Sequence, residues 1–183
     1  MSMDRRQALG TTLAALVGLR IAPSAAQDSA APPSLAMVGF ELIDEQRDES
    51  QRLQLDRRLA SIDRQFRLAV QAADLYRVVE VAPAAPQIAK LRDDVEYLYR
   101  CNGCLAPIGR RLGAAYIAAG WVQKVSNLIL NINVQIRDTA RDRIVLTKSV
   151  DVRSNTDESW SRGIAYLVRD MTEKRADDPR YGL

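Results

Sequence analysis

Two cysteines three residues apart are the most reactive side chains of this sequence. Cys101 and Cys104 enclose the flexible pair Asn102-Gly103 and are the only cysteines in the 183 residues. In an oxidising compartment such a pair most simply forms a local disulfide, and closing so small a loop stabilises a fold by about 2 kcal/mol. A redox-active pair, and free thiols or metal ligands, are the alternatives. Haem attachment is excluded because Leu105 follows where a histidine would be needed.

A second cluster of polar side chains lies in the stretch SVDVRSNTDESWSRGIAYL, residues 149–167. Asn155, with a glutamate three residues later, fits a helix N-cap and its capping-box partner, and Thr156 is an alternative cap. Asp151 and Arg153 alternate with valines, as solvated charges on a strand do. Arg153 stands where a calcium loop would need an oxygen ligand. The cluster therefore predicts a helix start, with a ligand or partner surface as the alternative.

Histidine does not occur in the sequence. Its absence removes Ser–His and Cys–His nucleophile pairs, histidine-ligated zinc and the commonest general acid–base group near neutral pH. The glycines form neither a phosphate loop nor a dinucleotide fingerprint. We therefore expect no catalytic residue, no metal and no cofactor. The one enzyme hypothesis with residues behind it is thiol–disulfide chemistry at Cys101 and Cys104.

Residues 1–26 have the layout of an export signal. The pair Arg5-Arg6 precedes a short apolar run, and Ser24-Ala25-Ala26 supplies the small residues of a cleavage site. Arg20 interrupts the apolar run, which is therefore too short to span a membrane. We expect cleavage after Ala26, export by the Sec or twin-arginine route, a periplasmic location and no transmembrane helix in the mature chain.

Charge and composition suggest one domain without a nucleic-acid footprint. The expected signal holds three of the 26 basic and one of the 23 acidic residues, so the net charge falls from +3 to +1 without it. A net charge so close to zero does not predict nucleic-acid binding. We expect a flexible lead-in over 27–34, a single domain over 35–175 and a loose tail over 176–183.

Apolar periodicity predicts an α/β fold with a mixed sheet of about five strands. The residues Leu55, Leu59, Ile62, Phe66 and Val70 form one helical stripe. The expected strands are 35–44, 75–81, 115–125, 128–136 and 143–152, and the expected helices are 51–73, a short one from Pro86, one ended by Gly113, and 157–173. The first strand–helix–strand unit requires parallel pairing and the last hairpin antiparallel pairing, with helices packed on the sheet.

The strand expected over 128–136 carries the candidate binding surface. Its even positions are apolar and its odd positions polar, so one face meets a core and the other meets water or a partner. Asparagine is a poor strand former, which calls for an explanation of this face. The candidate contacts are Trp121, Gln123, Lys124, Asn127, Asn131, Asn133, Asp151 and Arg153. The alternative is an exposed sheet face that resists aggregation.

Several segments resemble known cell-envelope domains. VGFELID, LYRVVEV, LGAAYIAAGWVQKV and LNINVQIRDTARDRIVLTKSVDV are similar to the α/β domain of the curli-secretion lipoprotein and the N-terminal domain of the Tol–Pal translocation protein. Gly113, Ala114, Tyr116 and Gly120 fit the pattern of those domains, whereas Ala115 replaces their aspartate and the lipid-bearing cysteine is missing.

GWVQKVSNLILN and SVDVRSNTDESWSRGIAYL more closely resemble a secreted proteobacterial family of unknown function, over roughly residues 35–172. That resemblance implies a place near quinoprotein (methanol or alcohol) dehydrogenases. We therefore expect a non-enzymatic periplasmic accessory protein that binds another periplasmic protein, or a ligand, by its polar sheet face. A redox enzyme using the cysteine pair and a homo-oligomeric envelope component are the alternatives.

Overall fold

The computed structural model describes residues 31–183, so the expected signal and half of the expected lead-in lie outside the described residues. Strands and helices follow one another in the predicted order. The elements are β1 (Ser34–Asp44), α1 (Arg52–Ala72), β2 (Arg77–Val79), α2 (Ala85–Asp94), α3 (Leu105–Arg111), β3 (Tyr116–Lys124), β4 (Leu130–Asp138), β5 (Arg143–Val152) and α4 (Asp157–Asp177).

Five strands form one mixed sheet in the order β2-β1-β3-β4-β5. The first strand lies inside the sheet and pairs in parallel with both β2 and β3. The remaining pairs, β3 with β4 and β4 with β5, are antiparallel. The predicted mixed α/β fold is therefore confirmed, and β5 is one edge of the sheet.

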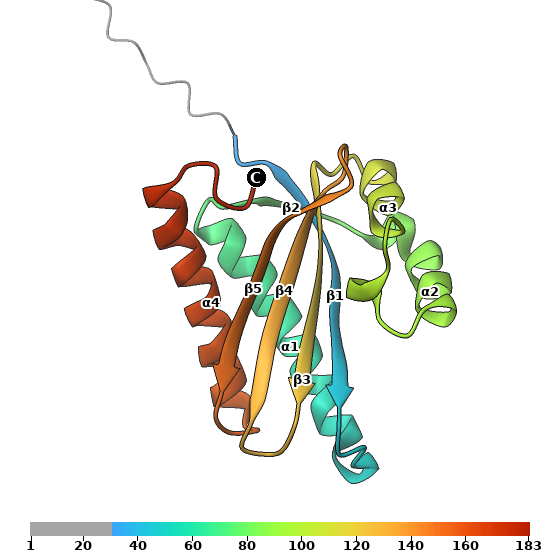
Figure 1. Ribbon diagram of the computed structural model, residues 1–183, viewed down its shortest axis with the longest axis vertical. Coiled ribbons are helices and arrows are strands. Elements are labelled where there is room, and N and C mark those ends of the chain that lie inside the picture. Colours follow the sequence, from blue (N-terminus) through green and yellow to red (C-terminus); the bar gives the residue numbers. More distant parts are fainter. Residues whose placement is uncertain (1–30) are drawn as a thin grey trace, which may run out of the picture. The chain divides into compact units, whose positions relative to one another are not determined.

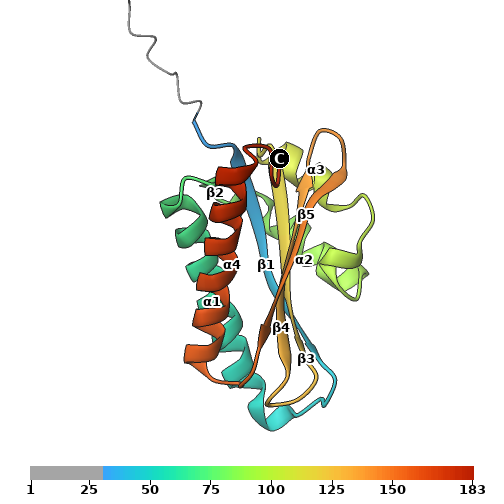
Figure 2. The same cartoon turned by 60° about the vertical axis from the view of Figure 1, so that its left-hand side comes forward.

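Helices cover the two faces of the sheet unequally (Figures 1 and 2). The two long helices, α1 and α4, lie side by side on one face and share its core with the strands. The other face is covered by α2 and α3, whose apolar residues pack on β1 and β3. The apolar cluster beneath α2 and α3 contains no residue of β4 or β5. On this side of the sheet, β4 and β5 are therefore more accessible than β1 and β3.

Amphipathic patterns account for the two long helices. Along α1 the buried apolar residues are Leu55, Ile62, Phe66 and Val70, which belong to the predicted stripe. Along α4 the five residues expected in the core, Trp160, Ile164, Leu167, Val168 and Met171, are all at most 5% exposed. Both helices thus bury an apolar stripe against the same sheet face.

Alternation along β4 is also confirmed, with one correction at its start. Leu130 and Ile132 are 1% and 0% exposed, as the period of two predicts. Leu128 was expected in the same apolar row but is 72% exposed, because the strand begins only at Leu130 and the preceding residues form the hairpin loop. The second predicted strand is likewise shorter than 75–81, since only β2 pairs with its neighbour.

The tail expected to be loose is held to the domain. Helix α4 continues to Asp177, and the Tyr76 hydroxyl donates a hydrogen bond of 2.5 Å to the Gly182 carbonyl. Arg175 in turn donates to the Tyr76 hydroxyl at 3.0 Å. Burial raises the pKa of Tyr76 to about 12, so the phenol keeps its proton for this bond.

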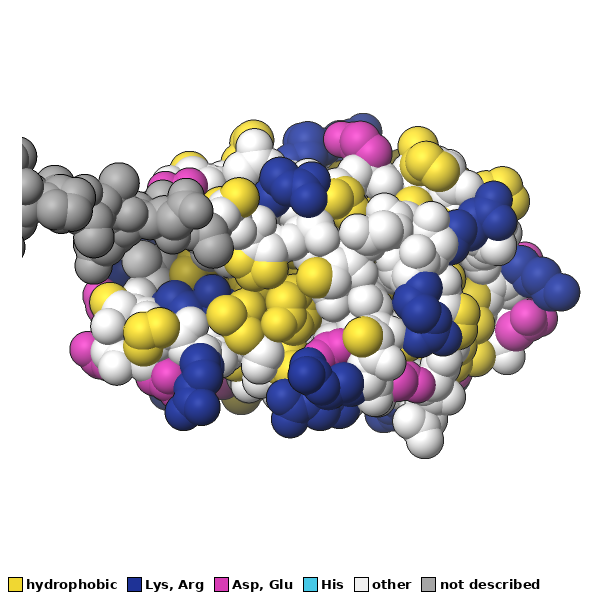
Figure 3. Space-filling model, turned by 90° about the horizontal axis from the view of Figure 1, so that it is seen from above, with side chains coloured by type: hydrophobic (Ala, Val, Ile, Leu, Met, Phe, Trp, Pro, Cys, Tyr) yellow, Lys and Arg dark blue, Asp and Glu magenta, His cyan; other side chains and the backbone are white. Residues whose placement is uncertain are grey.

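On the face seen in Figure 3, basic and acidic side chains are interspersed.

Candidate functional site

Hairpin register brings most of the predicted contact residues onto one sheet face. Trp121 lies opposite Asn133, and Gln123 lies opposite Asn131. Asn131 in turn lies opposite Asp151 of β5. Residues directly opposite one another in an antiparallel pair point to the same side. These five side chains therefore share the face away from α1 and α4.

The side-chain amide groups on this polar face donate hydrogen bonds to carboxylates and backbone carbonyls of the protein. Asn131 donates to the Asp151 carboxylate at 2.5 Å, and Gln123 donates to the Glu45 carboxylate at 2.6 Å. Asn133, which is buried, contacts the carbonyls of Trp121 and Asn131 at 3.5 and 3.4 Å. Such bonds satisfy the amides without a ligand, and they hold the Asp151 carboxylate in place.

Trp121 is covered, contrary to its expected role as an exposed contact. The ring of Tyr99 stacks on it with centroids 3.9 Å apart and planes 10° apart, leaving Trp121 9% exposed. Tyr99 belongs to a short 3-10 helix, η3 (Leu98–Arg100), which the sequence pattern did not reveal. The Arg100 guanidinium lies 5.5 Å from the Tyr99 ring centroid, and its Nε donates to the Tyr99 hydroxyl at 2.9 Å.

Lys124 is the clearest correction among the predicted contacts. Its side chain is fully buried and lies on the opposite face, because its register partner is the core residue Leu130. The ammonium group donates to Asp44 at 3.0 Å and to Gln46 at 3.1 Å. A buried charge needs such a partner. Lys124 therefore joins the ends of β1 and β3 and is not available to a partner protein.

Asn127 lies in the exposed loop between β3 and β4, outside the polar face. Its carbonyl and its side-chain oxygen both accept hydrogen bonds from Asn155, at 2.9 and 3.1 Å. Asn155 also accepts a bond from Arg58 at 2.9 Å, so it connects the loop to α1. The capping role expected first for Asn155 belongs to the alternative, Thr156, whose hydroxyl accepts from the Ser159 N–H.

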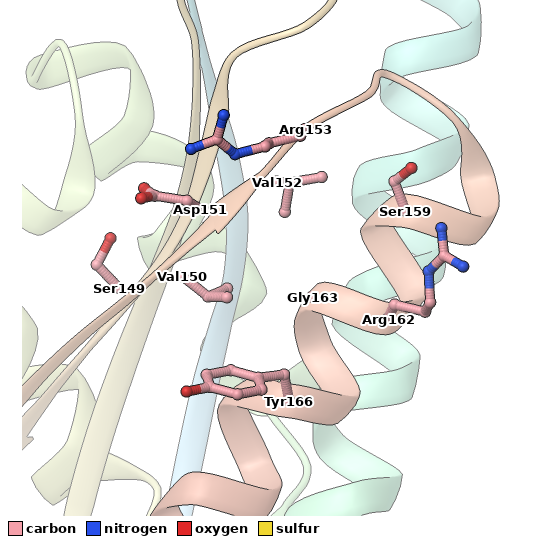
Figure 4. Close-up of a pocket in the computed structure, with 9 residues that line it drawn as sticks. All are labelled: Ser149, Val150, Asp151, Val152, Arg153, Ser159, Arg162, Gly163 and Tyr166. Carbon is pink, nitrogen blue, oxygen red and sulfur yellow. The ribbon is translucent and has the colours of Figure 1, made fainter.

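Asp151 and Arg153 border a groove between the edge strand and α4 (Figure 4). Val150 and Val152 point toward the helix, whereas Ser149 and Asp151 lie on the other side of the strand (Figure 4). The groove has a volume of about 610 Å³. Its lining residues are Ser149, Val150, Asp151, Val152, Arg153, Ser159, Arg162, Gly163 and Tyr166.

Two residues of α4 in this groove were missed by the sequence reasoning. Arg162 and Tyr166 are exposed and stand one helical turn apart. Arg162 is paired with Glu158 at 2.8 Å, and the Arg169 guanidinium lies 5.2 Å from the Tyr166 ring centroid. A tyrosine on the polar side of an amphipathic helix was the available signal. Gly163 between them lets the helix approach the sheet, since a Cβ there would lie 2.9 Å from Val152.

The two cysteines form a disulfide bond, as predicted. Both are partly exposed, and they lie between η3 and α3. Their Cα atoms are 5.8 Å apart, within the usual range for a disulfide. The bond fixes the loop that follows η3, the 3-10 helix whose Tyr99 covers Trp121. Its position therefore fits a structural clamp on this cover.

Within residues 31–183 no group of three or more acidic or cysteine side chains is placed to hold a metal ion. Over the same residues, no helix is long and apolar enough to cross a membrane.

Burial raises the pKa of the Glu41 carboxyl, whereas the hydrogen bond that it accepts from the Leu98 N–H acts in the opposite direction. Glu41 is thus the one perturbed carboxylate beside the polar face.

A protein family matches residues 33–172 and therefore most of the chain; its description is "Protein of unknown function (DUF2380)". The chain belongs to this family, DUF3280. The predicted resemblance to a family of unknown function is confirmed in this respect. The secretion of this protein and its association with quinoprotein dehydrogenases stay predictions. No curated protein matches the chain.

The following three solved structures are distant likenesses of this DUF3280 chain. The LpoB C-terminal domain from Salmonella enterica is 14% identical, with a TM-score of 0.41 over 70% of this chain and 87% of its own. TolB from Acinetobacter baumannii is 10% identical, with a TM-score of 0.45 over 81% and 29% of the two chains. A PelC dodecamer from Paraburkholderia phytofirmans is 13% identical, with a TM-score of 0.42 over 77% and 86%. With scores below 0.5, none of the three carries an inference about function.

Proposed function

We propose that this protein is a non-enzymatic accessory protein of the periplasm that binds an extended, acidic segment of another protein along the free edge of β5. The observation that carries the proposal is the groove between β5 and α4, which runs beside the edge strand of the sheet. An edge strand presents unpaired N–H and C=O groups, to which an extended segment can add as a further strand.

Charge supports an acidic segment as the occupant. Arg153 is exposed and has no ion pair or hydrogen bond within the described part of the chain. The groove lining holds two arginines, Arg153 and Arg162, against one aspartate, so its formal charge is +1. Arg162 is paired with Glu158, which lies outside the lining, so Arg153 is the arginine available to an acidic segment. A carboxylate of the segment near Arg153 would gain a charge-assisted hydrogen bond. Main-chain pairing would supply affinity, and Arg153 with Tyr166 would supply selectivity.

Two features support a periplasmic location. The sequence 1–26 has the layout of an export signal, and the Cys101–Cys104 disulfide is a bond typical of oxidising compartments.

The polar face extends the proposed site, because Ser149 and Asp151 belong to both the face and the groove border. A quinoprotein dehydrogenase as the partner remains a prediction from the family resemblance.

Site-specific cross-linking tests this function. We expect a photoreactive amino acid at Tyr166, in the full chain expressed in a bacterial host that encodes it, to capture one discrete partner protein. Arg153→Glu should abolish capture, because it opposes an acidic segment. The matched control Arg64→Glu, on an exposed position of α1, should leave capture unchanged.

Capture that persists at full yield in Arg153→Glu would overturn the site. A cross-linked band consisting of a second copy of the chain would indicate the homo-oligomer instead.

A further inference from the structure

The loop between β3 and β4 exposes its apolar side chains. Leu128 and Ile129 are 72% and 58% exposed, and Val125, at the start of the loop, is 37% exposed. These three residues are called the apolar tip below. Single exposed hydrophobic residues are common on protein surfaces, but here two are adjacent in the chain and the Val125 N–H donates to the Ile129 carbonyl at 3.1 Å. The loop lies at the end of the sheet away from the C-terminus (Figures 1 and 2).

Most backbone donors of this loop are bonded within the protein. The Ser126 N–H also donates to the Ile129 carbonyl, at 3.1 Å. The Ser126 hydroxyl accepts from the N–H groups of Leu128 and Ile129, at 3.2 and 3.1 Å. Four of the five N–H groups of residues 125–129, all but that of Asn127, thus have a partner in the protein. A segment that enters lipid needs such bonds, because hydrocarbon offers no partner to the backbone.

Contacts to both long helices hold the loop in place. Asn155, directly before the cap of α4, donates from its N–H and its side-chain amide to the two oxygens of Asn127. The same amide donates to Gln51, which precedes α1, at 3.1 Å, and Arg58 of α1 donates to Asn155. A loop that is already ordered loses little conformational freedom when it binds.

The size of the apolar tip favours a lipid surface over a protein as its occupant. A stable protein interface buries about 800 Å² on each partner and involves about 20–30 residues a side. Three aliphatic side chains on one loop do not supply such an area. A bilayer needs no complementary surface, and apolar side chains that enter it gain the free energy of leaving water. The predicted export would bring the tip close to the membranes that bound the periplasm.

The charges around the apolar tip are mixed. Arg47 and Arg153 are exposed in the segments that follow β1 and β5, and Glu45 and Glu49 are exposed in the first of these segments. Attraction to headgroups of one sign therefore does not dominate. Burial of apolar surface supplies the affinity, and this contribution is not screened by salt as surface charge is.

We propose that the apolar tip inserts into the surface of a lipid bilayer and holds the protein reversibly at a membrane of the cell envelope. A contact of three side chains gives weak and reversible binding. This site is separate from the proposed partner groove, since none of the three tip residues lines that groove. The protein can therefore bind its partner and the membrane at the same time.

Tryptophan reporters test the insertion. The full mature chain with Leu128→Trp is mixed with vesicles of phosphatidylcholine and phosphatidylglycerol. Leu68→Trp is the matched control, because Leu68 of α1 is 70% exposed and lies outside the tip. We expect vesicles to move the emission of Leu128→Trp to shorter wavelength, brominated acyl chains to quench it, and added salt to leave the shift in place. The control should show neither the shift nor the quenching.

A double variant measures the contribution of the native side chains. Leu128→Ser/Ile129→Ser should lower the partition coefficient between vesicles and water, measured by co-sedimentation, about a hundredfold. Both positions are exposed, so the variant should stay folded, as circular dichroism checks; Leu68→Ser should partition like wild type. The proposal is overturned if Leu128→Trp does not respond to vesicles, if Leu68→Trp responds equally, or if the double variant partitions as well as wild type.

Discussion

Glu41 shows how one side chain can link the sheet face to pH. Its carboxylate accepts the Leu98 N–H at 2.8 Å, and burial raises its pKa above the ordinary value of 4.5. The folded state thus binds the proton more tightly than the unfolded state. The stability that this group contributes is therefore fully present below about pH 4.5 and is lost as the pH rises through the folded pKa.

From this sign we predict the effect of Glu41→Gln. Glutamine keeps an oxygen for the Leu98 N–H but carries no charge, so the variant should gain melting temperature over wild type at pH 7 and gain less at pH 4. Thermal unfolding followed by circular dichroism at both pH values measures this. Glu80→Gln, at an exposed position, is the control. A larger gain at pH 4 than at pH 7 would contradict the prediction.

The disulfide also belongs to the residue scale. We predict that replacing both Cys101 and Cys104 by serine lowers the free energy of unfolding by about 2 kcal/mol, because the closed loop is short. Denaturant unfolding measures the loss. Capture of the partner at Tyr166 should survive the replacement, since the disulfide loop approaches Asp142 before the start of β5, whereas the groove residues 149–153 lie at the end of that strand. A variant of full stability that has lost its function in the host would favour the redox enzyme instead.

Single residues were predicted well where local pattern decides and poorly where distant segments meet. Asp151 was placed correctly on the exposed side of β5, whereas Arg153 is exposed as expected but lies directly after the end of that strand. Lys124 was not, because its burial depends on Asp44, eighty positions earlier in the sequence. Trp121 was misjudged for the same reason, since its cover, Tyr99, comes from the short 3-10 helix η3. A sequence pattern reports the face of an element but not what later folds over it.

At the scale of elements, Gly120 explains how β1 and β3 pack. A Cβ at this position would lie 2.4 Å from ring atoms of Phe40, its register partner on β1. The resemblance marked Gly120 as part of a pattern, and the structure gives the physical reason. Only glycine leaves room for the aromatic ring over the middle of the sheet.

We predict that Gly120→Ala destabilises the protein by about 1–3 kcal/mol, because the added methyl group overpacks the contact. Chemical denaturation measures the change. The double variant Phe40→Leu/Gly120→Ala should lose less than the sum of its two single variants, since leucine removes the ring that clashes. Strict additivity of the two losses would show that the methyl group is accommodated elsewhere.

Most elements were predictable because their apolar periods are long and regular. The bounds of β5 coincide with the expected 143–152, and the stripe of α1 was read directly from its spacing. By contrast, β2 has only three residues, Arg77–Val79. These are the residues that pair with β1, and the rest of the predicted strand 75–81 makes no ladder pairs. The β5–α4 groove was only half foreseen, because its helix side depends on how closely Gly163 approaches the sheet.

At the scale of the whole molecule, the export prediction has a direct test. We predict that the protein isolated from the periplasm begins at Gln27, because Ala26 ends the small-residue cleavage site. Intact-mass spectrometry of the purified protein measures this. Replacing Ala26 by a bulky residue such as Trp should block or shift cleavage. An intact chain starting at Met1, found in the cytoplasm, would contradict both the location and the oxidising context assumed for the disulfide.

The place of β1 inside the sheet has a consequence for biosynthesis. On the side of β1 that faces β3, Leu35 pairs with Tyr116 and Asp44 pairs with Lys124. A nascent polypeptide that emerges with its N-terminus first therefore cannot complete its central ladder until two thirds of it have been synthesised. Such a delayed closure keeps β1 unpaired with β3 for longer during synthesis, which is compatible with the predicted export by the Sec route.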